Sequence, residues 1–383
     1  MRMKVLSALC ASLVSVGSTV ALADTSSLRI PSQFMSARPA YLGGAFTAVA
    51  DDQNALFFNP AGLAYLDSTF AAFFDAESKV SIGSGGLLSM IDDGAKAFKI
   101  GGEIADQKDS SLKLDKIIEL GDLLSSRTVY AGSQLQGYLA RRKWGFALTM
   151  AGDVAAGIHS KILPETLDFA LISDTDLRVG YAHSLLDSKL SLGIAPYYKL
   201  RGQGGQANLS LADAFSTTFL DDQISIGQGF GADLGIMIRP VETMAPTFGL
   251  AILNVGDTKF YDPPEALKEK TQTTRKPDPL KQVVNAGFSI TPVEGNGFVR
   301  ISGELREINR PTAAEYKPAL GVEGGFRSSF VRTLMGVGWG NGGWSAGLEL
   351  RAFVKLRLAT YVEPNLFFDR VNKQRVWVMS FGL

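Results

Sequence analysis

Histidine and cysteine are the side chains that most often carry catalysis or bind a metal, and this chain has few of them. Its 383 residues include two histidines, His159 and His183, and a single cysteine, Cys10. Neither histidine lies in a metal-binding motif, and neither is accompanied by the serine-containing elbow of a Ser–His hydrolase. We therefore predict no catalytic residue, no metal site and no cofactor, and a protein that is not an enzyme.

A glycine-rich stretch at 227–235, GQGFGADLG, has the composition of a phosphate-binding loop. Such a loop must open a helix, because the helix N-terminus holds the phosphate. Here apolar residues continue to alternate through the stretch, which is the pattern of a β-strand. We predict instead that small residues on one face of neighbouring strands leave room for something enclosed; they are Gly180, Gly193, Gly229, Gly231 and Gly235.

The chain begins with the features of a secretory leader. Arg2 and Lys4 are followed by an uncharged stretch that closes with Ala21-Leu22-Ala23. A charged start, an apolar run and small residues at its end are the three parts of a signal peptide. We predict that 1–23 is cleaved, which would remove Cys10 and leave a chain without a thiol.

Composition gives no reason to expect nucleic acid as a partner. The 38 basic and 38 acidic residues balance, and loss of Arg2 and Lys4 with the leader would leave 36 against 38, a net charge of −2. The longest later run without charge, 333–348, is broken by glycines and is shorter than the roughly 18 residues of a spanning helix. The 41 glycines and 10% aromatic residues suit a chain rich in strands and turns.

From residue 69 onward the sequence predicts strands of the length that crosses a bilayer. Apolar and polar residues alternate in segments that are mostly about nine to thirteen residues long. We expect fourteen strands, over 69–75, 128–140, 144–155, 175–186, 189–200, 224–239, 247–255, 282–292, 298–307, 317–327, 330–340, 344–352, 354–363 and 375–383.

The register is clearest near the end of the chain. Between Trp344 and Val362 the even positions carry no charge, whereas the odd positions hold Glu349, Arg351, Lys355 and Arg357. Reversing the register would expose these charges to lipid, at roughly 2 to 4 kcal/mol for each basic residue at mid-depth. We therefore predict that the even face meets lipid.

The lengths of the predicted connections indicate in which membrane the strands lie. They alternate up to residue 297, with long ones at 76–127, 156–174, 201–223 and 256–281 separated by short ones. Bacterial outer-membrane barrels have short periplasmic turns, long external loops and an even number of strands. We predict an outer-membrane barrel surrounded by outer-membrane lipid, whose aromatic last strand, from Trp377 to Leu383, is read by the barrel-assembly machinery.

Residues 42–64, LGGAFTAVADDQNALFFNPAGLA, are apolar but irregular. Their glycines and proline favour turns, and the polar backbone groups of such a segment must be satisfied wherever it is buried. We predict that the strands enclose this segment. Its candidate functional residues are Gly43, Gly44, Phe46, Phe57, Phe58, Asn59, Pro60, Ala61 and Gly62.

The run from Gly43 to Ala64 resembles the N-terminal signature of the FadL-type outer-membrane proteins, which include the long-chain fatty acid transporter and PorV-like barrels. The resemblance implies a 14-stranded antiparallel transmembrane β-barrel, 68–383, with an N-terminal hatch, 24–67, inside its lumen. It also implies passage of hydrophobic molecules and their sideways release at a kinked strand. A glycine and a charge, Gly152 and Asp153, interrupt an apolar face, so we predict a bulge and lateral opening there.

Two functions stay open at this point, with a general water-filled porin as a third. An uptake protein would move hydrophobic small molecules such as long-chain fatty acids inward by diffusion, and the inward cations Lys199, Arg300 and Arg357 would bind a carboxylate. Alternatively, these cations form ion pairs with luminal acids such as Asp233, Glu304 or Glu349. The second function is that of a non-transporting PorV-like barrel, which serves as a binding partner for secreted or surface proteins.

Overall fold

The computed structural model describes most of the chain beyond the predicted leader. The described residues are 36–82, 128–159, 166–210, 224–241, 243–268, 275–293, 295, 297–310, 317–328, 331–367 and 370–383, with single positions between 96 and 119. The predicted signal peptide and the first part of the predicted hatch, 24–35, lie outside these residues.

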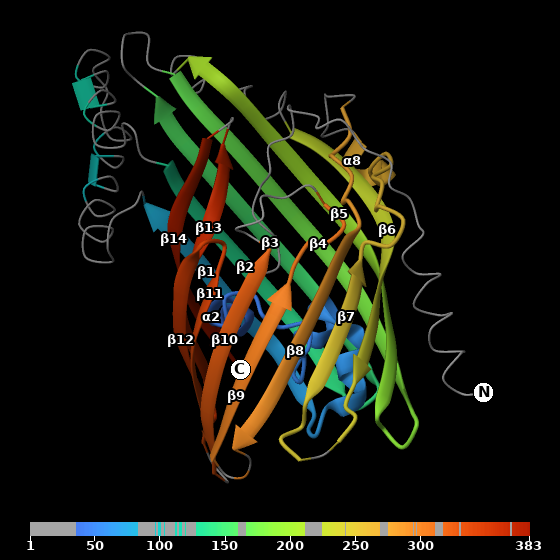
Figure 1. Ribbon diagram of the computed structural model, residues 1–383. Helices are drawn as coiled ribbons and strands as arrows, with labels where there is room; N and C mark the ends of the chain where they lie inside the picture. Colours follow the sequence, from blue (N-terminus) through green and yellow to red (C-terminus); the bar gives the residue numbers. More distant parts are fainter. Residues whose placement is uncertain are drawn as a thin grey trace.

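The described chain forms a closed antiparallel barrel of fourteen strands (Figure 1). Each strand pairs with its neighbours in sequence, and β1 closes the barrel against β14. The strands are β1 Phe70–Ile82, β2 Thr128–Arg141, β3 Trp144–His159, β4 Thr166–Leu185, β5 Leu190–Ser210, β6 Ile224–Ile238, β7 Thr247–Leu253, β8 Val283–Val293, β9 Gly297–Leu305, β10 Pro318–Arg327, β11 Arg332–Gly340, β12 Gly343–Arg351, β13 Lys355–Phe367 and β14 Arg370–Gly382.

The predicted number and order of strands are confirmed, but several strands are longer than predicted. β4 begins at Thr166 rather than 175, β5 continues to Ser210, and β13 and β14 pair as far as Phe367 and Arg370. Polar and small residues fill the extension of β5, as in 201–208, RGQGGQAN, so no alternation marks it. The extension of β4, 166–174, TLDFALISD, is mostly apolar but lies in the predicted long connection 156–174. The green strands in Figure 1 accordingly extend beyond the yellow and orange ones at the end opposite the short turns.

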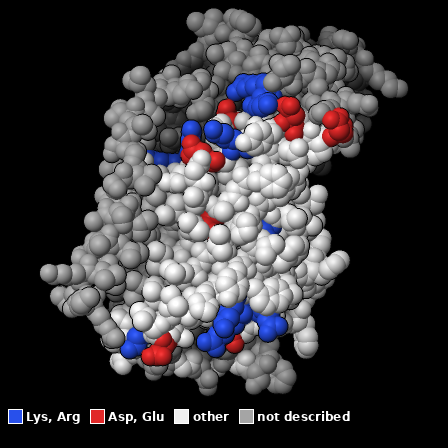
Figure 2. Space-filling view, turned by 90° about the vertical axis from the view of Figure 1, so that its right-hand side faces the viewer, with Lys and Arg blue, Asp and Glu red and all other residues white. Residues whose placement is uncertain are grey.

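The predicted register of the outer face is confirmed over most of the wall. On β13, Leu356 and Leu358 are exposed whereas Lys355, Arg357 and Ala359 are buried. Figure 2 shows the outcome on one side of the barrel, where a broad uncharged band separates charged residues near the two ends. This band is the surface of a membrane-spanning barrel, in which strands turn apolar residues to lipid and polar ones inward.

Two local details complete the architecture. The hairpin between β11 and β12 turns at Asn341 and Gly342, both with positive φ (52° and 70°), as a two-residue type I′ turn requires. At the upper end of β13 the even face departs from the prediction, because Val362 is buried at 8% exposure and its side chain covers the Cα of Gly343. No helix among the described residues has both the length and the apolar character needed to cross a membrane.

The lipid-facing register gives a direct stability prediction. Leu358 is 54% exposed on the outer face and pairs with Leu348 and Met379 on the neighbouring strands. We expect Leu358→Arg to lower the free energy of unfolding in lipid vesicles by roughly 2 to 4 kcal/mol, because the guanidinium must enter hydrocarbon. Urea titration followed by tryptophan fluorescence measures this change.

A matched control is Val241→Arg, since Val241 is also 54% exposed but lies in the connection between β6 and β7. It should leave the unfolding free energy unchanged. An equal loss in both variants would contradict the assignment of the even face to lipid.

Candidate functional site

Residues 36–66, here called the luminal segment, lie inside the barrel in its lower half as drawn in Figure 1. The segment contains the short helices α2 Ala37–Tyr41 and α3 Ala55–Phe58 and the 3-10 helix η1 Pro60–Tyr65. α2 packs against β11 to β14, and η1 packs against β3 to β6. The segment therefore bridges opposite sides of the wall.

Asn59 closes the turn between α3 and η1. Its backbone is extended (φ −160°, ψ 99°), as expected before Pro60, and its side chain accepts a hydrogen bond from the N–H of Ala61 at 3.2 Å. The side-chain amide donates to the carbonyls of Thr47 at 2.8 Å and Ile236 at 3.3 Å. One side chain thus joins two parts of the segment to β6.

Glycines in the wall make room for this turn, as the sequence suggested. A Cβ at Gly193 would overlap the backbone of Pro60 and Ala61, and a Cβ at Gly235 would overlap the side chain of Asn59. The wall and the segment therefore fit backbone against backbone. The remaining predicted glycines divide: Gly180 faces Leu56 and Leu63, whereas Gly229 and Gly231 face residues 258–260 of the connection after β7.

Arg38 is the centre of the polar contacts at the other end of the segment. It is 1% exposed and forms ion pairs with Asp51 at 2.6 Å, Asp52 at 2.8 Å and Glu323 at 2.7 Å. Burial alone would raise the pKa of Asp51, but Arg300 and Arg38 outweigh it and hold that pKa well below its ordinary value. The carboxylate of Asp51 therefore stays charged between two arginines.

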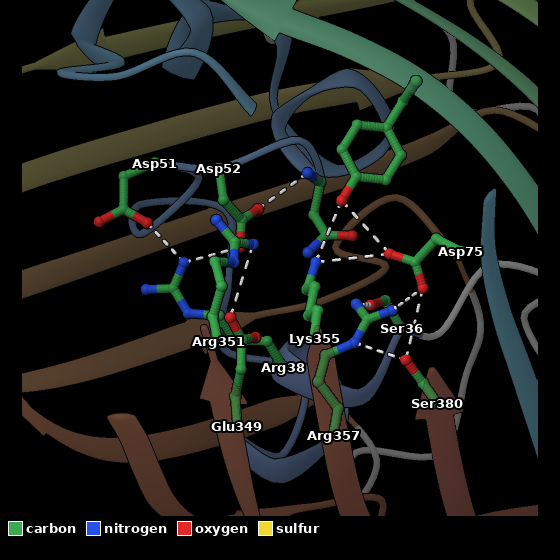
Figure 3. A network of polar contacts seen from close by, with 12 residues as sticks. Ser36, Arg38, Asp51, Asp52, Asp75, Glu349, Arg351, Lys355, Arg357 and Ser380 are labelled. Carbon is green, nitrogen blue, oxygen red and sulfur yellow. Dashed lines mark hydrogen bonds and ion pairs between the residues drawn. The ribbon is translucent and has the colours of Figure 1, made fainter. Parts of the chain in front are cut away.

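A second polar cluster fixes the start of the segment to β1, β13 and β14 (Figure 3). Arg357 pairs with Asp75 and donates to the hydroxyls of Ser36 at 3.0 Å and Ser380 at 2.6 Å. Lys355 also reaches Asp75, at 3.4 Å. The cluster joins three strands around the first described residue of the segment.

Arg178 of β4 holds the middle of the segment. Its guanidinium donates to the carbonyl of Leu56 at 2.9 Å and pairs with Asp233 of β6. It also lies between the rings of Phe57 and Tyr197, at 4.8 and 4.5 Å from their centroids. A buried arginine with this many partners orders both the wall and α3.

Wall side chains satisfy further backbone groups of the segment. Glu304 accepts the N–H groups of Phe46 at 2.8 Å and Thr47 at 2.7 Å. Three wall serines donate to segment carbonyls: Ser191 to Ala61, Ser289 to Ala48 and Ser345 to Tyr41. An irregular backbone is thus accommodated away from water because the wall supplies its missing partners.

The three cations predicted to bind a carboxylate are all in ion pairs. Lys199 pairs with Asp174 at 3.2 Å and Asp176 at 2.9 Å, and Arg300 pairs with Asp51 at 2.7 Å. Arg357 pairs with Asp75, as described above. The alternative of luminal ion pairs therefore describes these residues, although their partners differ from Asp233, Glu304 and Glu349.

The aromatic residues of the predicted hatch motif form part of its core. Phe46 is fully buried, Phe57 is 7% exposed and Phe58 is half-buried. The rings of Phe46 and Phe58 meet edge to face at 5.2 Å between centroids. Gly43 and Gly44 have positive φ (67° and 90°) and turn the chain after α2, and Gly62 lies against the carbonyl of Ala50.

The predicted bulge at Gly152 and Asp153 is wrong. β3 keeps its register with β2 and β4 through this point, where Gly152 pairs with Ser133 and Ser173. The glycine leaves the ladder intact because it lies on the outer face with open space beside it, and Asp153 points inward and accepts a hydrogen bond from Tyr130. Register shifts occur elsewhere, between Ala72 and Asp75 in β1, at Leu167–Phe169 in β4 and at Ile290–Val293 in β8.

Gly152 nevertheless marks a feature of the outer wall. A shallow groove of about 450 Å³ crosses β1 to β4 at its level. Its floor includes Gly152 and the in-register serines Ser78, Ser133 and Ser173. Gly152 lies between Met150 and Val154 on the outer face of β3, so the groove deepens where a large side chain is missing.

His183 takes part in no polar cluster of catalytic type within the described residues. His183 is exposed on the outer face of β4, and His159 ends β3 rather than lying in a loop as predicted. Within the described residues no group of three or more His, Cys, Asp or Glu side chains is placed to hold a metal ion.

Sequence reasoning missed the residues that hold the luminal segment most directly, Arg38, Asp75, Arg178 and Glu323. The alternation could have placed Arg178 and Glu323 on the inner face, because both occupy inward positions of their strands. It could not have paired them with Leu56 or Arg38, which are 122 and 285 residues away.

Comparison with known proteins gives only structural likenesses. No family model and no curated protein matches the sequence. Similar solved structures include the toluene transporter TodX of P. putida (TM-score 0.47, 10% identity, 91% of this chain and 97% of that chain). A Pseudomonas aeruginosa FadL homologue has a TM-score of 0.48 and 12% identity over 92% of this chain and 99% of that chain. The Ralstonia pickettii toluene transporter TbuX has a TM-score of 0.46 and 12% identity over 91% of this chain and 98% of that chain.

The Arg38 cluster predicts how the luminal segment is released. Arg38→Met removes the cation that faces Asp52 and Glu323, and uncompensated buried charges typically cost about 3 to 5 kcal/mol. We expect the segment to become sensitive to protease while the barrel keeps its folded mobility on unheated gels. Arg142→Met, in the exposed turn between β2 and β3, is the control and should cleave at the wild-type rate.

The fit at Gly193 gives an independent prediction. A valine side chain there must overlap Pro60 and Ala61, so Gly193→Val should displace the segment and raise single-channel conductance in planar bilayers. Gly152→Val adds the same side chain where nothing lies within 4 Å and should leave conductance at the wild-type level. Unchanged conductance in a folded Gly193→Val barrel would mean that the segment does not limit passage.

Proposed function

We propose that this protein is an outer-membrane transport protein that admits hydrophobic small molecules, such as long-chain fatty acids, by diffusion. The observation that carries the proposal is the luminal segment itself, which occupies the lumen of a closed barrel and is held there by hydrogen bonds and ion pairs. In this proposal the segment acts as a hatch, and residues 24–67 form one functional unit that regulates passage through the strands of 68–383.

The energetics of the segment suit a reversible hatch. Buried ion pairs such as Arg38–Glu323 and Arg178–Asp233 fix geometry well but contribute little net stability, because their desolvation offsets most of their attraction. An acyl chain gains about 0.8 kcal/mol for each methylene that it buries, so contacts between a few methylenes and Phe57 or Phe58 would offset the loss of one such pair.

Sideways release through the wall at Gly152 and Asp153 is the second part of the proposal. Gly152 opens on the outer groove and Asp153 points into the lumen from the next position of β3. Because the hydrogen-bond ladder is continuous here, release would require β3 to separate locally from β2 or β4. The missing side chain at Gly152 would make that separation easier than at a packed position.

One observation favours the second function, that of a non-transporting partner of secreted or surface proteins. The candidate cations Lys199, Arg300 and Arg357 are engaged with acids of the wall or the segment. A wall that only supports the luminal segment, without transport, would show the same ion pairs. The two functions differ in whether a hydrophobic solute crosses the membrane.

Uptake of radiolabelled oleate by bacterial cells that lack their own uptake protein tests the proposal. Expression of the wild-type chain should restore uptake, and Phe57→Asp with Phe58→Asp should lower it at least tenfold, since two carboxylates would enter the apolar core of the hatch. Phe353→Asp is the control, because Phe353 is 96% exposed in the turn after β12. Absence of uptake by a correctly inserted wild-type barrel would refute transport and leave the partner function.

A further inference from the structure

Lys79 differs from the other buried cations of the inner wall. It lies on β1 with 3% exposure, yet it takes part in no hydrogen bond or ion pair with any residue that the structure describes. By contrast, Arg178, Lys199 and Lys355 each have a carboxylate within ion-pair distance. The ammonium of Lys79 has no partner among the described residues and stays open to the lumen, where it can donate a hydrogen bond to an oxygen of a ligand.

Three side-chain acceptors without a partner lie near Lys79 on β1 and β2. Two positions before it, Glu77 has a side-chain oxygen, Oε1, without a partner, and two positions after it the hydroxyl of Ser81 has none. Gln134, which pairs with Glu77 across β1 and β2, contributes an unpaired Oε1. All three side chains are at least nine-tenths buried on the inner face.

The strand register places two further polar side chains beside Lys79. Lys79 pairs with Gly132, which in turn pairs with Asp153, so one row of the wall runs from a lysine across a glycine to an aspartate. A Cβ at Gly132 would overlap the carboxylate of Asp153 and approach the hydroxyl of Tyr130. The glycine thus brings Asp153 and Tyr130, which are hydrogen-bonded at 2.7 Å, toward Lys79.

The charges of this Lys79 cluster select among ligands. Three acids, Glu77, Asp153 and Glu363, face the same part of the lumen as Lys79, and none lies within ion-pair distance of it. A ligand carboxylate at Lys79 would have to lie beside these acids. A neutral hydroxyl suits the cluster better, since its oxygen can accept from the ammonium while its proton is donated to Glu77 or Gln134.

We propose that the Lys79 cluster binds the neutral, hydroxyl-bearing head group of an amphiphilic ligand. This inference rests on the proposed uptake function and narrows its substrate class to alcohols and related neutral amphiphiles. The cluster also touches the hatch, because the second oxygen of Glu77, Oε2, accepts the N–H of Ala37 at 3.1 Å. A ligand hydroxyl on Oε1 would therefore share a carboxylate with the first turn of α2.

Equilibrium dialysis of the mature chain in lipid nanodiscs tests the inference with three probes of equal chain length: dodecanol, dodecanoate and dodecane. Retention by empty nanodiscs is subtracted. The wild type should bind dodecanol more tightly than dodecanoate. Lys79→Met should weaken dodecanol binding about tenfold or more, as expected for loss of a hydrogen bond to a charged group, and leave dodecane binding unchanged.

Two further variants keep the test decisive. Lys189→Met, in the exposed turn between β4 and β5, is the matched control and should bind all probes as the wild type does. Should Lys79→Met fail to fold, Lys79→Gln keeps a neutral donor and should show an intermediate loss for dodecanol alone.

The outcomes separate this inference from the function on which it rests. Specific binding of no probe would overturn the uptake proposal. Binding of all probes with no effect of Lys79→Met would leave uptake standing and overturn the Lys79 site, whose polar groups would then bind water only. Tighter binding of dodecanoate, lost in Lys79→Met, would overturn the neutral head group.

Discussion

The need to satisfy the polar backbone of an irregular segment away from water governs this structure. Residues 36–66 have too little helix to satisfy themselves, so partners must come from the wall. Glu304, Ser191 and Ser345 supply them from β9, β5 and β12. The inner face of the barrel is polar for this reason. Which residues line it is determined by the backbone of the segment as much as by any solute that passes.

Each strand consequently meets two solvents. On β13 the alternation Leu356, Arg357, Leu358 places leucines against lipid and a guanidinium against Asp75 and Ser36. Hydrocarbon penalises an arginine on one face, and on the other the buried carboxylate of Asp75 would keep only Lys355, at 3.4 Å, as its cationic partner. The two requirements fix the same register, which explains why the barrel can specify a unique arrangement with few large apolar residues inside.

The parts of this architecture that depend on one strand at a time could be predicted from the sequence. Alternation gave the fourteen strands and the outward face, and the glycines Gly180, Gly193 and Gly235 indicated an enclosed segment. It failed in the last part of β5, as in 201–208, because polar and small residues at successive positions remove the period. It also failed at Gly152, since a glycine on the outer face resembles a bulge in sequence, and it could not pair Arg38 with Glu323 across 285 residues.

The two ends of the luminal segment are both held by close contacts with glycines of the wall. η1 fits against Gly193 and Gly235, and Tyr41 to Gly43 at the end of α2 fit against Gly338, Gly340 and Gly347. Charged groups such as Arg357 and Glu323 add hydrogen bonds at α2, whose partners water or a polar ligand can replace. Opening at α2 would therefore have to break both kinds of contact, and only the polar kind can be exchanged for a ligand.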